Sequence, residues 1–346
     1  MSNYTASALL AFQSKINQTF NAPELRELQN PILRQALSYQ PLLLTDVKSI
    51  KESDKRSVYG YYMKRRTATN GTARSTAPTG TQGDSGQVAL SWVTFSETFM
   101  AYKQTGADNI FPMVEQLENG IMQTQRILRE RVGAYIVSQL HANRTQAVAS
   151  GTRNATWNDT TYAFENDASQ ANLFFENAAS VLRQNKYYEK LDVVADPKVF
   201  KLANFNRFQG AGNAQNLGYQ FQQYNPDGIM EHSVLGSDVA TDYAEGCAIV
   251  LPQGSFSITP WIPSINRRGE GDYESYNGGY GTIIDATGLP LSYAVRGWAQ
   301  KADGSAAGSV VQDIQMNFEL SVDIAFVASP LSTAGESAIF EFGQTS

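Results

Sequence analysis

Hydrophobic residues near the end of the chain follow a strict period of two. Seven of them occupy every second position from Ile314 to Phe326, and mostly polar residues stand between them. This period places all seven on one face of a β-strand, so the pattern predicts a long strand with one buried face and one face in water. Residues 291–300 form a second strand pattern, and Asp303-Gly304 supplies turn residues between the two. We therefore expect a long antiparallel hairpin near the C-terminus, which would form a projecting β-arm.

Between Asp108 and Val148 the period changes from two to that of a helix. The apolar positions there are Ile110, Val114, Leu117, Ile121, Leu128, Val132, Ile136 and Leu140, with Arg126, Arg129 and Arg131 among the charged residues between them. The pattern predicts one amphipathic helix of roughly 60 Å, longer than the diameter of about 50 Å expected for a compact globule of this chain length. We interpret it as a spine across a flat, elongated subunit. A coiled-coil dimer is the alternative, but the stripe lacks a strict heptad and has Gly120 and Arg131 near it.

A second hairpin is predicted in the first third of the chain. Residues 57–69 are rich in aromatic and β-branched side chains, and residues 87–99 alternate in hydrophobicity. The intervening residues 70–86 contain much Gly, Pro, Ser and Thr, which favours an irregular connection. Strands of this length span roughly 40 Å, and an isolated two-stranded ribbon is only marginally stable in water. The hairpin is expected to be a projecting arm that needs a partner surface, and an ordinary internal sheet is the alternative.

The first 45 residues read as an arm of short helices. Leu9, Phe12, Ile16 and Phe20 have helical spacing, while Asn-Pro and similar pairs around residues 21–31 interrupt the pattern. Pieces this short cannot bury their own apolar faces, so they must lie on another surface, either of the same subunit or of a neighbour.

The middle of the chain reads as a mixture of helices and strands. Residues 149–168 are expected to form a polar loop, after which Ser169 caps a helix that has Phe174, Ala178, Val181 and Leu182 on one face. Leu191–Ala195 is predicted as a buried strand, and Asp196-Pro197 as the cap and first turn of another helix. Residues 205–230 read as exposed loops.

Charge and composition exclude several classes of function for this protein. Residues 1–219 contain 23 Lys or Arg and 18 Asp or Glu, whereas residues 220–346 contain 4 and 15. Neither half has the dense basic patch of a sequence-specific nucleic-acid reader. The single cysteine, Cys247, excludes an intrachain disulfide and is expected to be buried. No apolar run is long enough to span a membrane, and no secretory signal is evident, so we expect no membrane association.

The sequence offers no recognisable catalytic, metal-binding or cofactor-binding motif. Common hydrolase, metalloprotease and nucleotide-binding patterns are missing, and His141 and His232 have ordinary neighbours that favour surface positions. The four tryptophans at positions 92, 157, 261 and 298 could line a carbohydrate site, although core packing is the commoner role of scattered tryptophans. We therefore expect a non-enzymatic protein.

The order of these elements resembles the Hong Kong 97 fold of tailed-bacteriophage major capsid proteins, an α+β fold. The resemblance implies an N-terminal arm at 1–46, an extended loop at 47–104, a peripheral domain with the spine helix at 105–167, an axial domain at 168–289 and C-terminal strands that return to the peripheral domain at 290–346. The segment from Asp192 to Pro197, followed by Val199-Phe200-Lys201-Leu202, is similar to a strand, Asx-Pro and helix sequence found in many such proteins.

The resemblance also implies a function. The chain would self-assemble through pentamers and hexamers into an icosahedral head around double-stranded DNA, inside the host bacterial cytoplasm. Portal, scaffold and decoration proteins are implied partners, and contact with DNA would be weak and non-specific. Basic residues around the extended loop could meet acidic residues of another copy's C-terminal half. The expected contact residues are Arg56, Tyr59, Tyr61, Lys64, Arg65, Arg66, Arg74, Val88, Leu90 and Trp92 in the loop, and Leu9, Phe12, Ile16 and Phe20 in the arm. An encapsulin-type compartment with the same fold and a β-rich carbohydrate-binding or adhesive protein are the alternatives.

Overall fold

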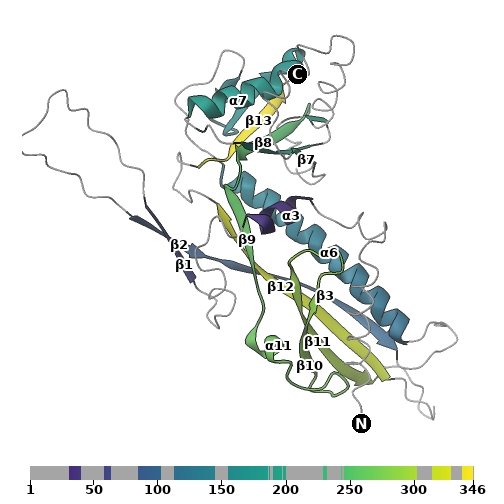
Figure 1. Ribbon diagram of the computed structural model, residues 1–346. Coiled ribbons are helices and arrows are strands. Elements are labelled where there is room, and N and C mark those ends of the chain that lie inside the picture. The colour runs from purple at the N-terminus through teal and green to yellow at the C-terminus, as the bar shows by residue number, and fades with distance from the viewer. Residues whose placement is uncertain are drawn as a thin grey trace, which may run out of the picture.

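A computed structural model describes residues 31–39, 58–63, 85–102, 113–144, 155–185, 187, 190–196, 198–199, 229–231, 243, 245–301, 314–328 and 337–345. These residues form an elongated molecule with two parts (Figure 1). The body contains a five-stranded sheet, the long helix α6 and the short helix α3, and the lobe contains a six-stranded sheet and helix α7. A separate two-stranded hairpin leads away from the body.

Helix α6 (Met113–Ala142) is the spine of the body. Its 30 residues correspond to about 45 Å. The apolar face predicted from Leu117 to Leu140 is confirmed, because all of its members are fully buried. Three predictions about the helix are wrong. Val114 is 39 % exposed, since Met113 takes the buried position at the start of the helix, and Arg129 is buried rather than exposed. The helix also ends at Ala142 and not at Val148, because Asn143 and Arg144 are not helical, while Ile110 and residues 145–148 lie outside the described residues.

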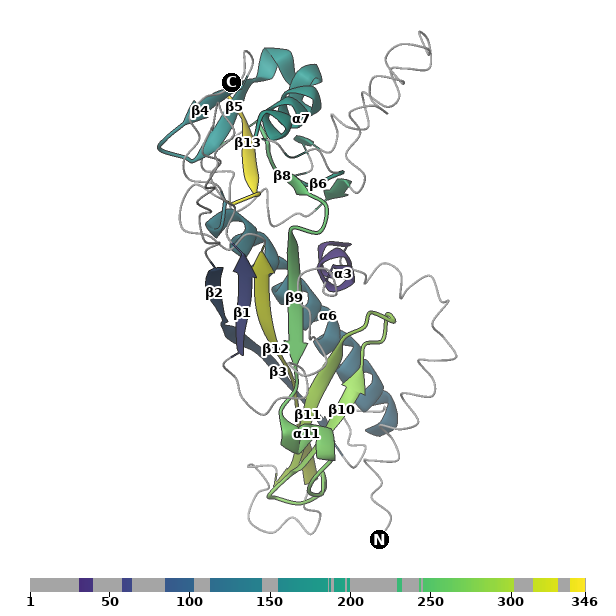
Figure 2. The same ribbon diagram turned by 60° about the vertical axis from the view of Figure 1, so that its left-hand side comes forward.

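The strand predicted around Ile314–Phe326 is confirmed as β12 (Ile314–Ala328). It pairs antiparallel with β11 (Ser292–Lys301), so the predicted C-terminal hairpin is also confirmed. The expectation that this hairpin is a projecting arm is wrong. Strand β12 is the centre of the body sheet, whose order is β10-β11-β12-β3. Strand β9 (Phe256–Trp261) pairs with the C-terminal half of β12, on the same side of β12 as β11 (Figure 2).

The remaining body strands are β10 (Gly279–Ile284) and β3 (Trp92–Tyr102), which form the two edges of this sheet. Helix α6 runs beside β3 and contributes side chains to its outer edge. Gln116 Oε1 accepts a hydrogen bond of 3.0 Å from the Tyr102 backbone N–H, and Arg131 donates one of 3.1 Å to the Ser96 carbonyl. These contacts satisfy edge groups that have no strand partner there.

The predicted N-terminal hairpin exists, although residues 64–69 of its predicted first strand lie outside the described residues. Strands β1 (Val58–Met63) and β2 (Ser85–Leu90) pair antiparallel over six residues, or about 20 Å. The single strand expected at 87–99 is divided at Ser91, and β3 continues from Trp92 as a partner of β12 instead of β1. Most of the expected second strand is therefore part of the body sheet.

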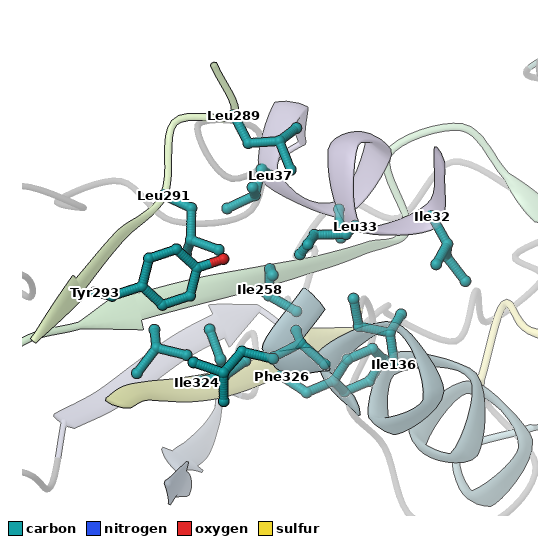
Figure 3. Packing of buried hydrophobic residues seen from close by; sticks show 14 of the residues in the cluster. Ile32, Leu33, Leu37, Ile136, Ile258, Leu289, Leu291, Tyr293, Ile324 and Phe326 are labelled. Atoms are coloured by element: carbon teal, nitrogen blue, oxygen red, sulfur yellow. The ribbon is translucent and has the colours of Figure 1, made fainter. Parts of the chain in front are cut away.

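Helix α3 (Pro31–Ser38) is the part of the N-terminal arm that the structure describes. It lies on its own subunit. Ile32 and Leu33 are fully buried, and the Ser257 hydroxyl of β9 donates a hydrogen bond of 3.0 Å to the Ala36 carbonyl. Figure 3 shows Ile32, Leu33 and Leu37 beside Ile258 and Ile136. The sequence left open whether the arm lies on its own subunit or on a neighbour, and this helix lies on its own subunit.

The lobe sheet has the order β4-β5-β13-β8-β6-β7. Its strands are β4 (Thr156–Asn158), β5 (Ala163–Asp167), β6 (Leu191–Ala195), β7 (Ile229–Glu231), β8 (Cys247–Pro252) and β13 (Phe340–Thr345). The strand predicted at Leu191–Ala195 is confirmed with the same bounds. The prediction of a polar loop at 149–168 is wrong from residue 156, because two short strands form there with Phe164 fully buried between aromatic rings.

Helix α7 (Phe174–Gln184) covers one face of this sheet, and its predicted apolar face is confirmed. The predicted cap is wrong by two residues. A 3₁₀ helix, η1 (Ala168–Leu173), precedes α7, and Asp167 caps it by accepting a hydrogen bond from the Ser169 backbone N–H. The Asp196 cap is confirmed, since its Oδ1 accepts from the Val199 N–H at 2.8 Å.

The two sheets do not follow the segment boundaries implied by the resemblance. Strands β9 and β10, from the expected axial segment 168–289, belong to the body sheet, while β13, from the expected peripheral segment 290–346, belongs to the lobe sheet. The chain therefore crosses between body and lobe repeatedly, and the two parts are not separate stretches of sequence.

Candidate assembly surfaces

The hairpin β1–β2 carries four of the expected contact residues, namely Tyr59, Tyr61, Val88 and Leu90. The backbone register pairs Tyr59 with Ala89, Tyr61 with Gln87, and Val88 with Gly60. The other expected basic residues and the arm residues lie outside the described residues: Arg56, Lys64, Arg65, Arg66, Arg74, Leu9, Phe12, Ile16 and Phe20. The segment that joins β1 to β2, residues 64–84, contains four of these basic residues.

The root of the hairpin is fixed to the body. Leu90 is only 4 % exposed within the subunit, which leaves it little surface for contact with a second copy. The Trp92 ring packs against Trp261, with ring centroids 6.3 Å apart. The Thr94 hydroxyl donates a hydrogen bond to the Asp323 carboxylate of β12. These contacts set the direction in which the hairpin leaves the body.

The body sheet presents a second candidate surface on the face opposite α6. Met100 is 53 % exposed and Ile284 41 % exposed on this face. The Arg296 guanidinium lies 5.6 Å from the centre of the Tyr280 ring and 5.3 Å from that of Trp298, which holds the arginine in one orientation by cation–π contact. Aromatic residues, Met and Arg are enriched in protein–protein interfaces, so this face has the composition of a contact surface.

Hydrogen bonds between side-chain amides hold the polar groups of this open face in fixed positions. Gln315 donates a hydrogen bond of 2.8 Å to Asn317, and Asn317 donates one of 3.0 Å to Gln300 on the neighbouring strand. Such a row of amides fixes polar groups without adding charge, so the face combines rigidity with low net charge.

A third candidate surface is the loop from Gly269 to Gly279, next to helix α11 (Ser264–Arg268). Tyr276 is 66 % exposed there, the highest value among the large hydrophobic side chains that the structure describes. The loop is nevertheless well anchored. Tyr273 packs over Gly281 and Gly297, where any Cβ atom would lie within 3 Å of the Tyr273 side chain. A rigid loop with an exposed aromatic side chain loses little entropy on binding.

The main site that sequence reasoning missed is a buried ionic cluster under α6. Arg129 donates a hydrogen bond of 2.6 Å to Asp285, and the Tyr293 hydroxyl donates one of 2.9 Å to the same oxygen. Burial, and then the Asp285 charge, raise the pKa of Tyr293 well above its usual value. Gln125 adds two bonds to the same loop, to the Ile284 carbonyl at 3.0 Å and from the Ala286 N–H at 2.9 Å. The cluster is buried and joins α6 to the β10–β11 loop, which is a structural role.

His141 corrects another expectation. It was expected at the surface, but it is partly buried, and its Nδ1 lies 2.9 Å from the Glu341 carboxylate of β13. His232 lies outside the described residues. Among the residues that are described, no group of His, Cys, Asp and Glu is arranged to hold a metal ion. The described helices include none with the length and apolarity needed to cross a membrane.

The tryptophans do not form a common binding platform. Trp92 and Trp261 pack together, but Trp157 packs on Phe164 in the lobe, and Trp298 stacks with Arg296 in the body. This distribution favours packing roles over a carbohydrate site.

Comparison with solved structures identifies the fold. No protein family matches the sequence, and no curated protein matches it either. Among solved structures, a chain of the Cyanophage A-1(L) capsid asymmetric unit matches with a TM-score of 0.55 and 12 % identity, over 91 % of this chain and 92 % of that chain. The chain has the fold of a phage capsid protein. The mixed α+β capsid fold expected from the resemblance is thereby confirmed as a whole.

Two further solved phage structures also match this chain. A chain of Mycobacterium phage Che8 matches with a TM-score of 0.48 and 12 % identity, over 88 % of this chain and 90 % of that chain. A chain from the capsid of Ralstonia phage GP4 matches with a TM-score of 0.42 and 7 % identity, over 84 % of each chain.

Proposed function

We propose that this chain is the major capsid protein of a tailed bacteriophage, which self-assembles into the icosahedral head around the double-stranded DNA genome. The observation that carries the proposal is the likeness to the cyanophage capsid chain, which extends over nine tenths of both chains. A likeness of this extent includes the body, the lobe and the connections between them, so it is not the sharing of one small motif. The protein is then a component of the virion, assembled in the host cytoplasm, and not an enzyme.

The geometry of the subunit supports an assembly role. Within the part of the chain that the structure describes, the hairpin β1–β2 forms a sheet of its own, separate from the sheets of the body and the lobe. A two-stranded ribbon gains stability only when a further surface covers it. In our proposal another copy of the chain provides this surface, and the subunits form pentamers and hexamers that close into a shell.

The domain names of capsid proteins can be assigned to the two sheets. We propose the lobe, with its six-stranded sheet and α7, as the axial domain, and the body, with α6 and the five-stranded sheet, as the peripheral domain. The hairpin with its connection is the extended loop. This assignment follows the sheets instead of the segment boundaries 168 and 289, because β-sheet pairing joins strands from distant parts of the chain.

The contact residues form three groups in this proposal. Tyr59, Tyr61, Val88 and Trp92, with the basic residues Arg56, Lys64, Arg65, Arg66 and Arg74, contact a second copy through the extended loop. Leu9, Phe12, Ile16 and Phe20 contact one through the arm. The third group is the open face of the body sheet around Met100 and Arg296. Portal, scaffold and decoration proteins are further proposed partners, and packaged DNA makes only weak, non-specific contact.

Electron microscopy of the purified chain tests the proposal. We expect closed particles of uniform size, and a protein that remains a monomer at high concentration would contradict it. The content of the particles separates the phage head from a cargo compartment with the same fold. Heads recovered from infected cells should contain long double-stranded DNA, whereas a compartment would contain a cargo protein.

A further inference from the structure

The body and the lobe meet at the C-terminal end of α6. The last buried residues of the helix, including Ile136 and Leu140, share one hydrophobic core with Cys247, Ile249 and Ile339 on the underside of the lobe sheet. Apolar packing of this kind is strong but non-directional, so it holds two parts together without fixing their angle. A fixed angle requires directional contacts at the same junction.

Glu341 of β13 provides such contacts. Its carboxylate is only 1 % exposed, and the same oxygen lies 2.9 Å from His141 Nδ1 and 3.2 Å from Arg144 Nε. Both partners come from the end of α6, one in its last turn and one just after it. A carboxylate buried to this extent must keep ionic or hydrogen-bonded partners, because an isolated buried charge is very costly. The pair therefore constrains β13 to one position over the helix end.

Arg144 extends the constraint to a third element. Its Nη1 donates a hydrogen bond of 2.6 Å to the His141 carbonyl, and its Nη2 donates one of 3.0 Å to the Thr161 carbonyl in the β4–β5 turn. The guanidinium also lies 5.8 Å from the centre of the Tyr162 ring. One planar side chain thus joins α6, β13 and the β4–β5 turn in a fixed geometry.

The β4–β5 turn shows that this geometry is enforced. Tyr162 has φ of +51°, and it is the one residue other than glycine with positive φ among those the structure describes. Such a conformation persists where surrounding contacts determine it. Here Arg144 holds the Thr161 carbonyl, and the Thr161 hydroxyl lies 2.5 Å from the hydroxyl of Tyr243. Tyr243 is only 2 % exposed, and its burial, together with Glu165 and Glu341, raises the pKa of its hydroxyl.

We propose that Glu341, held by His141 and Arg144, is a positioning residue for the angle between lobe and body and acts beside the buried hydrogen bond from Tyr39 to Asp192 of the lobe. Its consequence for particles rests on the proposed function: in a closed shell the lobe and the body contact different neighbours, so the angle between them sets the curvature. Besides its effect on stability, a buried ion pair can specify one geometry, because its hydrogen bonds are directional. Loss of the pair is therefore expected to widen the range of angles while the shared hydrophobic core keeps the subunit folded.

A pair of spin labels tests the proposal on the subunit itself. Labels are placed on cysteines introduced at Glu176 of α7 and Arg268 of α11, both exposed, while the native Cys247 stays unlabelled because it is 1 % exposed. The distance distribution is measured in the full-length chain, with unlabelled chain added in excess so that only distances within a subunit contribute. Glu341→Gln, which keeps the size and removes the charge, should at least double the width of the distribution. An unchanged width overturns the proposal.

Two further variants keep the result interpretable. Arg126→Gln removes an exposed ion pair with Glu130 on the same helix and should leave the width as in the original protein. If Glu341→Gln does not fold, Arg144→Lys replaces it, because lysine keeps the charge but cannot make the forked contacts; an unchanged width then overturns the proposal equally.

Particles give the second readout. Glu341→Gln should form shells of mixed diameter where the original protein forms shells of one diameter, and a single unchanged diameter counts against the proposal. If the original protein forms no shells, the proposed function fails, but the spin-label distances still decide whether Glu341 sets the angle.

Discussion

Arg129 of α6 and Asp285 of the β10–β11 loop form an ion pair of 2.6 Å in which neither side chain is more than 1 % exposed. The two residues are 156 positions apart in the sequence. Tyr293 and Gln125 bind the same loop, so the spine helix is fixed to the body sheet by a polar cluster inside an otherwise apolar core.

The ion pair leads to the first prediction, which concerns subunit stability. Arg129→Met should lower the free energy of unfolding by about 3–5 kcal/mol, because it leaves the Asp285 charge buried without its cation. Asp285→Leu should have a cost of similar size. The double variant should lose less than the sum of the two, since neither charge remains. Urea denaturation of the unassembled subunit measures all three, and single variants that lose less than about 1 kcal/mol would show that the pair is dispensable.

The second prediction concerns Gly120 in the middle of α6. Alanine is a better helix former than glycine by about 1 kcal/mol, so sequence alone favours Gly120→Ala. A Cβ atom at this position would, however, lie 2.3 Å from the Phe99 ring of β3. We expect Gly120→Ala to destabilise the subunit by about 1–3 kcal/mol through overpacking. Asn119→Ala, at the exposed neighbouring position, is the control and should be neutral or slightly stabilising; equal effects of the two would contradict the close contact.

The third prediction is a pH dependence at Tyr39. Its hydroxyl donates a hydrogen bond of 2.6 Å to Asp192 of the lobe. Burial, and then this bond and the Asp192 charge, raise the pKa of Tyr39 to about 12. The folded state thus holds the proton more tightly than the unfolded chain, where tyrosine has a pKa of about 10. The resulting stabilisation is complete below about pH 10 and is lost as the pH rises through about 12.

Tyr39→Phe tests the predicted direction of this pH dependence of stability. The variant should be less stable than the original protein by about 1–3 kcal/mol at neutral pH, because Asp192 loses a buried donor. The difference should shrink between about pH 10 and pH 12, where the original protein alone loses this contribution. Tyr276→Phe, at a side chain that is 66 % exposed, is the control and should show no such change. A constant difference across this range would contradict the account.

The fourth prediction concerns the connection between β1 and β2. Met63 pairs with Ser85, so residues 64–84 can be replaced by Asn-Gly, which closes a two-residue hairpin turn. The shortened subunit should fold with an unchanged melting temperature, because the body and lobe contacts remain. It should fail to form closed particles, because it lacks the outer part of the extended loop. Calorimetry and electron microscopy provide the two readouts, and normal particles from this variant would remove the loop from the assembly mechanism.

The fifth prediction concerns charge at the same loop. Replacement of Arg65 and Arg66 by Glu should weaken assembly, if the loop meets the acidic C-terminal half of another copy. The defect should depend on salt, since added ions screen exposed charges over about 10 Å at 0.1 M. Light scattering of assembly at several salt concentrations measures it. Assembly that proceeds equally at all of them would rule out the charge pairing.

Regular periods in the sequence predicted the elements that carry the fold. The alternation around Phe318 gave β12, and the helical stripe around Leu128 gave α6, because each pattern has a single period that only one secondary structure satisfies. The identity of partners was harder to predict. The alternating pattern of residues 87–99 is compatible with a strand in any sheet. The three-dimensional structure shows that β2 pairs with β1, whereas β3, which begins at Trp92, pairs with β12.

The remaining differences arise from contacts between distant residues. Arg129 has the sequence context of a surface charge, and its burial depends on Asp285, which no local pattern connects to it. The same applies to Glu341, whose partners His141 and Arg144 are about 200 positions away. A glycine next to the apolar stripe was the one available signal for the close approach at Gly120, because a helix retains glycine where another element leaves no room for a side chain.

The mass of the purified chain in solution tests the central claim most directly. The chain has a mass of 38.0 kDa. We predict that native mass measurement at neutral pH finds closed particles in the megadalton range, built from many identical copies, with at most a small population of pentamers and hexamers. A single species of one chain mass, unchanged as the concentration is raised, would contradict the account.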